Sequence, residues 1–168
     1  KNNNTQIASG PSSGGQLDQD LKINGKYYAL LIGNSKYDDP KWVSLKSPVN
    51  DVKEISKILK KSYKFEKIIT LTDANRNEMF DAFDLLASIT TDKDYILIYY
   101  SGHGDTKKNQ AYWVPVDAPK KWSPRDWISI RDISVYVEDI KAQHLVLMVD
   151  SCYTGSAFKG SNKINEDN

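Results

Sequence analysis

The hydrophobic pattern of this chain alternates between two kinds of segment. Short, continuous apolar runs are typical of strands buried on both faces of a parallel sheet, and they occupy residues 27–32, 67–71, 95–100 and 145–149. Between them, apolar residues recur every three or four positions, which indicates amphipathic helices at about 48–59, 75–87 and 130–140. Strands that alternate with helices predict an α/β fold, a mostly parallel central sheet with helices on both faces.

Local signals refine the expected boundaries. Ser47-Pro48 is typical of an N-cap followed by proline in the first helical position, and Asn75 with Glu78 resembles a capping box. Residues 112–116 are expected to form a short strand or hairpin arm. The segment 117–128, with two prolines, is expected to be a loop.

Two of the predicted strands end in residues that can carry chemistry. The run 145–149 is followed by Asp150, Ser151 and Cys152, the only cysteine of the chain, and the run 95–100 leads into Ser101-Gly102-His103-Gly104. Open α/β sheets keep their sites at the carboxyl ends of their strands. Adjacent strands lie about 4.8 Å apart, so the two ends could bring imidazole and thiol together. A histidine beside a thiol can take its proton and create the nucleophilic thiolate.

Composition narrows the classes of function. The 23 basic and 22 acidic side chains give a net charge of +1, which argues against a nucleic-acid or membrane-surface partner. No apolar run approaches the roughly 20 residues that span a bilayer. A single cysteine fits a reducing compartment, so a cytoplasmic location is expected.

Polar composition marks both ends of the chain. Residues 1–25 are rich in Asn, Gly and Ser and are expected to form a flexible arm or linker. The folded domain is expected over 26–158, and the polar residues 159–168 are expected to form a C-terminal linker.

The motifs around His103 and Cys152 resemble those of caspase-like cysteine peptidases. Gly33-Asn34 after the first strand and Asn50-Asp51-Val52 at the first helix also fit, in the same order. Asp-Ser-Cys is more similar to the metacaspase and bacterial caspase-homologue branch than to the Gln-Ala-Cys-X-Gly of animal caspases. The resemblance covers residues 26–158, the large catalytic subunit, and implies a three-layer α/β/α fold.

The resemblance also implies roles for individual residues. Cys152 and His103 would form a catalytic dyad, and the backbone N–H groups of Gly104 and Cys152 an oxyanion hole. Asp51 and Asp150 correspond to residues that line the pocket for the side chain before the scissile bond. Two carboxylates there would attract lysine or arginine and repel aspartate, so we expect a peptide or protein substrate cleaved after a basic residue.

The family continues with a small subunit that completes the sheet. We therefore expect a C-terminal small-subunit segment or a second chain as a partner, possible self-cleavage, and Lys159 and Lys163 as candidate cleavage points. Asp117 and Asp126 are isolated, and no carboxylate follows Cys152 before Glu166. No metal site or cofactor is therefore expected, and a calcium requirement, known in some relatives, is not indicated.

The same residues fit other classes of protein less well. Phe158 stands where a tyrosine phosphatase needs arginine, Cys-X-X-Cys is absent, and one cysteine with two histidines is too few for a typical structural zinc site. His144 precedes its strand, which predicts a structural or solvent-facing role. The serious alternative to a peptidase is a catalytically silent caspase-like scaffold or regulatory module.

Overall fold

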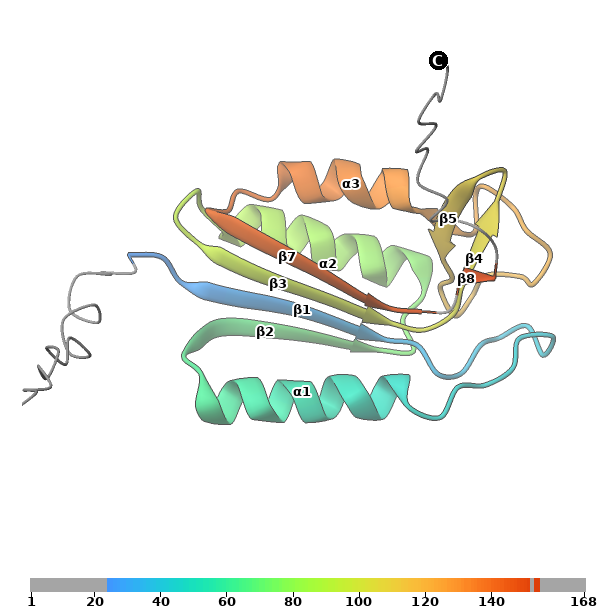
Figure 1. Cartoon of the computed structure of the whole chain (residues 1–168), viewed down its shortest axis with the longest axis horizontal. Helices are drawn as coiled ribbons and strands as arrows, with labels where there is room; N and C mark the ends of the chain where they lie inside the picture. The colour runs from blue at the N-terminus through green and yellow to red at the C-terminus, as the bar shows by residue number, and fades with distance from the viewer. Residues whose placement is uncertain (1–23, 152, 155–168) are drawn as a thin grey trace, which may run out of the picture.

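A parallel four-stranded sheet forms the centre of the computed structural model, which describes residues 24–151, 153 and 154. Its strand order is β2-β1-β3-β7. The four strands are β1 (Tyr27–Gly33), β2 (Phe65–Thr72), β3 (Tyr95–Ser101) and β7 (His144–Asp150). Helix α1 (Pro48–Ser62) covers one face, and α2 (Arg76–Ile89) and α3 (Ile130–Asp139) lie on the other (Figure 1). The predicted three-layer α/β architecture is confirmed.

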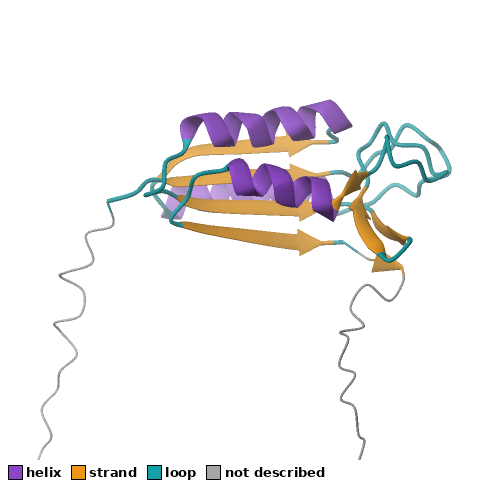
Figure 2. Ribbon diagram, turned by 90° about the horizontal axis from the view of Figure 1, so that it is seen from above, coloured by secondary structure: helices purple, strands orange, loops and turns teal. Residues whose placement is uncertain are grey.

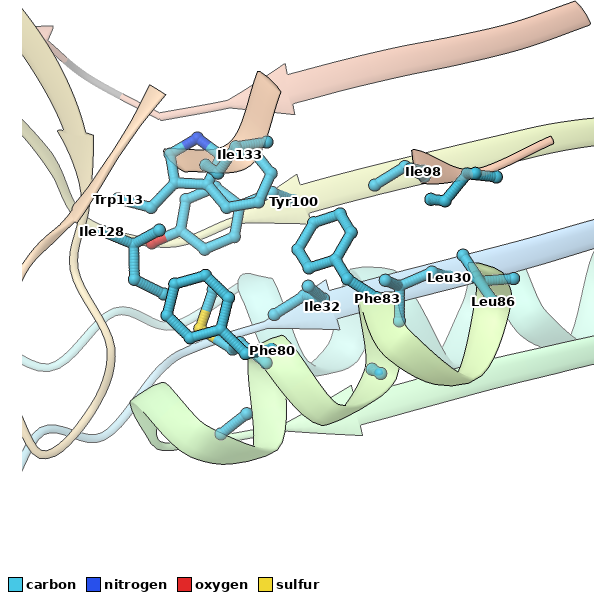
Figure 3. Packing of buried hydrophobic residues seen from close by; sticks show 14 of the residues in the cluster. Leu30, Ile32, Phe80, Phe83, Leu86, Ile98, Tyr100, Trp113, Ile128 and Ile133 are labelled. Carbon is cyan, nitrogen blue, oxygen red and sulfur yellow. The ribbon is translucent and has the colours of Figure 1, made fainter. Parts of the chain in front are cut away.

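The core divides according to the alternation of side chains along each strand. Leu30, Ile32 and Ile98 point toward α2, where they pack with Phe83 and Leu86 (Figure 3). The intervening residues of β1 point to the other face, where Ala29 and Leu31 pack against Val52 of α1. Continuous apolar strands thus fill both interfaces, as the sequence predicted.

Strand β7 departs from this pattern. The sequence predicted burial on both of its faces, but its side chains are exposed by 53% at Val146, 38% at Leu147, 52% at Met148 and 39% at Val149. The physical reason is position, because β7 is the edge strand of the sheet (Figure 1) and α1 packs mainly on β1 and β2. The prediction of a buried strand is therefore wrong for the described part of the chain.

A second, smaller sheet stands beyond the carboxyl ends of the parallel strands. It has the order β6-β5-β4-β8, with β4 (Gly104–Lys107), β5 (Gln110–Trp113), β6 (Ile128–Ser129) and β8 (Tyr153–Thr154). The expected strand at 112–116 is confirmed as the hairpin arm β5, although it ends at Trp113. Loops 34–47 and 114–127 gather at the same end of the molecule (Figure 2).

The predicted N-terminal cap is present at α2 but not at α1. Asn75 and Glu78 form the predicted capping box of α2. Ser47 makes no side-chain cap at α1; instead the hydroxyl of Ser35, on the loop after β1, accepts the Val49 N–H at 3.1 Å. The first turn of α1 is thereby tied to the end of β1.

Gly33 lies where β1 and α1 approach most closely. A Cβ atom at this position would lie 2.4 Å from the Pro48 carbonyl oxygen and 2.8 Å from a methyl group of Val52. We expect Gly33→Ala to lower the free energy of unfolding by about 1–3 kcal/mol, because backbone and core must shift to admit the methyl group. Urea unfolding followed by tryptophan fluorescence measures this, with Lys53→Ala on the exposed face of α1 as control; equal stabilities would contradict the expected clash.

The predicted terminal segments, 1–25 and 159–168, lie outside the described residues apart from Asn24 and Gly25. Within the part of the chain that is described, none of the helices is long and apolar enough to cross a membrane.

Candidate active site

The ends of β3 and β7 are adjacent, as the sequence predicted. Ser101 is paired with Asp150 in the parallel register, and the Gly102 N–H donates to the Asp150 carbonyl at 3.4 Å. Two residues farther on, Gly104 of β4 is paired with Tyr153 of β8. Cys152 itself lies outside the described residues, but the residues before and after it flank the segment that carries His103.

One carbonyl group fixes the imidazole of His103. The Nε2 atom lies 2.7 Å from the backbone oxygen of Val43. A carbonyl oxygen can only accept a hydrogen bond, so Nε2 carries the proton and, in the neutral ring, Nδ1 is the free acceptor. An orienting group for the histidine could not be identified from the sequence, because a backbone carbonyl can come from any residue type.

Two tyrosine hydroxyls hold the backbone of the same histidine. The His103 N–H donates to the Tyr37 hydroxyl at 2.8 Å, and the Tyr100 hydroxyl donates to the His103 carbonyl at 2.7 Å. Tyr37 in turn donates to the carbonyl of Asn34 at 3.2 Å. Burial raises the pKa of Tyr37, so its hydroxyl stays protonated and available as a donor.

Asn34 connects the strand ends beneath the site. Its N–H donates to the Ser101 carbonyl at 2.9 Å, and its fully buried side chain accepts from the Ala74 N–H at 2.9 Å. The same amide donates to the Ala74 and Val114 carbonyls at 3.3 and 3.4 Å. The Gly33-Asn34 motif therefore joins β1 to β3 and to the loops after β2 and β5.

The faces of the His103 ring contact aromatic side chains. Trp42 stacks against it, with ring centroids 4.8 Å apart and an angle of 28° between planes, and Tyr37 lies at 4.8 Å with a tilt of 48°. Burial lowers the pKa of His103 below its usual value, and the positive charge of Lys120 lowers it further; the bond to Val43 acts in the opposite direction. The balance favours the neutral imidazole.

The two predicted carboxylates lie around Tyr99 of β3. Burial raises the pKa of Tyr99, and the negative charges of Asp150 and Asp51 raise it further, against a hydrogen bond with Ser101 that lowers it. Asp150 is exposed at the end of β7, and Asp51 is half-buried in the first turn of α1. The structure thus brings both carboxylates within electrostatic reach of one side chain.

An open cleft of about 480 Å³ lies beside His103 and the end of β7. His103, Gly104 and Asp150 line it, whereas Asp51 lies outside its lining. The other lining residues are Trp42, Leu45, Lys46, Ser47, Pro48, Ser101, Gly102, Asp105, Lys120 and Ser151. In the described residues, no three His, Asp or Glu side chains are close enough to hold a metal ion.

His144 occupies the opposite end of the sheet. It is exposed at the start of β7 and stacks on Tyr95, with ring centroids 5.6 Å apart. The structural or solvent-facing role predicted from the sequence agrees with this position, which is remote from the cleft.

Comparisons with known proteins identify two curated relatives of this chain. The mouse and human mucosa-associated lymphoid tissue lymphoma translocation protein 1 are each 33% identical to this chain over 125 residues, which is 74% of the chain. The match spans only 14% of the mouse protein and 15% of the human one. Whether the chain is nearer to the metacaspase branch stays a prediction.

A solved structure with a similar fold supports the fold assignment alone. Protein GSU0716 from Geobacter sulfurreducens superposes with a TM-score of 0.64 at 22% identity, covering 77% of this chain and 52% of that protein. A family model described as the caspase domain matches residues 26–168. The chain therefore belongs to the caspase-domain family of peptidases.

Proposed function

We propose that this protein is a cysteine endopeptidase in which His103 and Cys152 form the catalytic dyad. The observation that carries the proposal is the bond from His103 Nε2 to the Val43 carbonyl, because it leaves Nδ1 as the base. The described neighbours of Cys152 support this pairing, since Ser151 lines the cleft together with His103 and Tyr153 is paired with Gly104.

The reaction follows from these groups. Nδ1 of His103 takes the thiol proton, and the thiolate attacks the peptide carbonyl carbon. Backbone N–H groups of Gly104 and Cys152 would stabilise the oxyanion, each by roughly 3 kcal/mol. The imidazolium then gives its proton to the leaving amine, and the C–N bond breaks. Water, deprotonated by the same nitrogen, hydrolyses the thioester and frees the cysteine.

The substrate in this proposal carries lysine or arginine before the scissile bond. Asp150 lines the cleft. The negative charges of Asp150 and Asp51 both raise the pKa of Tyr99, so the two carboxylates lie near the same side chain. Carboxylates bind guanidinium and ammonium groups through charge-assisted hydrogen bonds. An aspartate side chain in the same position would meet like charge, which is unfavourable.

The proposal includes a C-terminal small-subunit segment that pairs with β7. An edge strand presents unpaired backbone groups, and β7 also exposes apolar side chains on both faces, with Val146 and Met148 on one and Leu147 and Val149 on the other. A further strand with its own helices would cover both. Self-cleavage at Lys159 or Lys163 would then separate the two subunits.

A panel of fluorogenic peptides tests the activity. The peptides differ only in the residue before the scissile bond, which is Arg, Lys, Gln or Asp, and Cys152→Ala is the control. We expect cleavage after Arg and Lys and none by the variant. Cleavage after Asp alone would overturn the specificity. No cleavage of any peptide, together with an unreactive Cys152, would favour the catalytically silent scaffold.

The lowered pKa of His103 predicts how activity depends on pH. The base must be neutral, so kcat/KM is expected to stay high down to pH values below 6.5, the usual histidine pKa, and to fall only at lower pH. Lys120→Met removes a positive charge that lowers this pKa, so the acid limb should move to higher pH. Profiles of wild type, Lys120→Met and the control Lys121→Met measure it; a limb that does not move would contradict the role of the charge.

A further inference from the structure

We propose that Trp42 and Lys120 form the subsite for the residue that follows the scissile bond, and that this subsite favours an acidic side chain. The inference rests on the proposed peptidase function and deepens it, because it assigns a substrate preference to the leaving-group side of the same cleft.

The indole ring of Trp42 forms one wall of the subsite and is held in a fixed position. Trp42 is 5% exposed, and its Nε1 donates to the Ala118 carbonyl at 3.0 Å. Trp127 also contacts its ring, with centroids 5.6 Å apart. The indole is therefore fixed by a hydrogen bond and by packing, and it borders the cleft beside His103.

The ammonium group of Lys120 lies against the Trp42 ring. The Lys120 side chain is exposed, and its Nζ lies 3.5 Å from the centroid of the Trp42 ring, a cation–π contact that holds the charge in place. No salt bridge in the described part of the chain involves Lys120. The nearby Asp39 carboxylate accepts backbone N–H groups of Lys120 and Lys41, at 2.8 and 2.9 Å.

The order of contacts along the cleft gives the direction of the substrate. Asp150 adjoins Gly102, the residue before His103, whereas Trp42 stacks on His103 and carries Lys120. A basic side chain bound at Asp150 places the carbonyl carbon before the imidazole. The leaving amine must then reach His103 to be protonated, so the next residue of the substrate lies toward Trp42 and Lys120.

Two other charged residues of the cleft lining, Lys46 and Asp105, bear on the charge at this subsite. An acidic substrate side chain would be repelled by an unpaired carboxylate at Asp105. Its Oδ2 atom lies 3.1 Å from Lys107 Nζ, and its Oδ1 atom accepts the Thr106 N–H at 2.7 Å. Asp105 is thus compensated. Lys46 lines the same cleft, but Lys120 is the lining cation that contacts Trp42.

Quenched peptides with Arg before the scissile bond and Glu, Gln or Lys after it test the proposal. For the wild type we expect kcat/KM in the order Glu, Gln, Lys, with about fivefold between Glu and Gln, the size of a partly exposed ion pair. The preference should weaken at high salt. Lys120→Glu should reverse the order, whereas the control Lys121→Glu, one residue away and outside the cleft lining, should keep it.

The possible results distinguish a failure of the proposed subsite from a failure of the proposed peptidase activity. Equal rates for the three peptides, or an order that Lys120→Glu leaves unchanged, would overturn the subsite while leaving the peptidase intact. No cleavage of any of the peptides would overturn the proposed function and the subsite with it. Should Lys120→Glu fold poorly, Lys120→Gln is expected to abolish the preference for Glu without reversing it.

Discussion

Replacing His103 with alanine is expected to lower kcat/KM by about a thousandfold, within the range that a positioned general acid–base contributes. The thiol would lose the base that ionises it, and the leaving amine the group that protonates it. No side chain in the described part of the chain duplicates this role, because the other histidine, His144, is exposed at the far end of the sheet.

The same variant should slow alkylation of Cys152. The thiolate is the reactive form, and a free thiol has a pKa near 8.5, so at neutral pH the loss of the imidazole leaves mostly unreactive thiol. Cys152 is the only cysteine, which allows intact-protein mass spectrometry to follow the reaction with iodoacetamide without ambiguity.

His144→Ala is the matched control, because it removes the same side chain from the opposite edge of the sheet. It should leave both the alkylation rate and kcat/KM unchanged. Equal alkylation rates for wild type and His103→Ala would show that the two residues do not interact, and the dyad would have to be abandoned.

The positions of the strand ends could be predicted from the sequence, because buried parallel strands have a simple sequence pattern. Continuous apolar runs identified β1, β3 and β7, and the residue that follows each run necessarily lies at the carboxyl edge of the sheet. Burial of β7 could not be predicted in the same way. An apolar run shows that a strand is suited to burial, but what covers it depends on its position in the sheet, here at the edge.

The features that the sequence did not reveal depend on backbone atoms or on atypical turns. Val43 contributes a carbonyl to the site, and its side chain is 75% exposed, so residue type carries no signal. The β4–β5 hairpin turns at Lys108 and Asn109, both with positive φ. Such turns usually contain glycine, and without it the hairpin was expected only as one arm.

Aromatic residues in the loop after β1 did carry a signal that composition alone could not interpret. Tyr37 and Trp42 belong to a polar segment between a strand and a helix, where large rings are costly unless they pack. In the structure both contact His103. Aromatic residues in a loop beside a predicted site are therefore reasonable candidates for groups that position its catalytic side chains.

Asp150→Asn is expected to lower kcat/KM for a peptide with Arg before the scissile bond by about 10- to 100-fold. Hydrogen bonds between charged partners contribute about 1.5–3 kcal/mol, and asparagine keeps the shape while removing the charge. Asp51→Asn should have a smaller effect, since Asp51 lies outside the cleft lining and acts from the first turn of α1.

A second peptide with citrulline, which is close to arginine in shape but uncharged, distinguishes a role in recognition from a structural one. Wild type should strongly prefer Arg over citrulline, and Asp150→Asn should reduce that ratio, whereas a variant that merely distorted the site would lower both rates together. Asp81→Asn on the exposed face of α2 is the control. If Asp150→Asn cleaved the Arg peptide at the wild-type rate, the basic side chain would have to bind elsewhere. The direction of the substrate along the cleft, which was inferred from binding of the basic side chain at Asp150, would then no longer be supported.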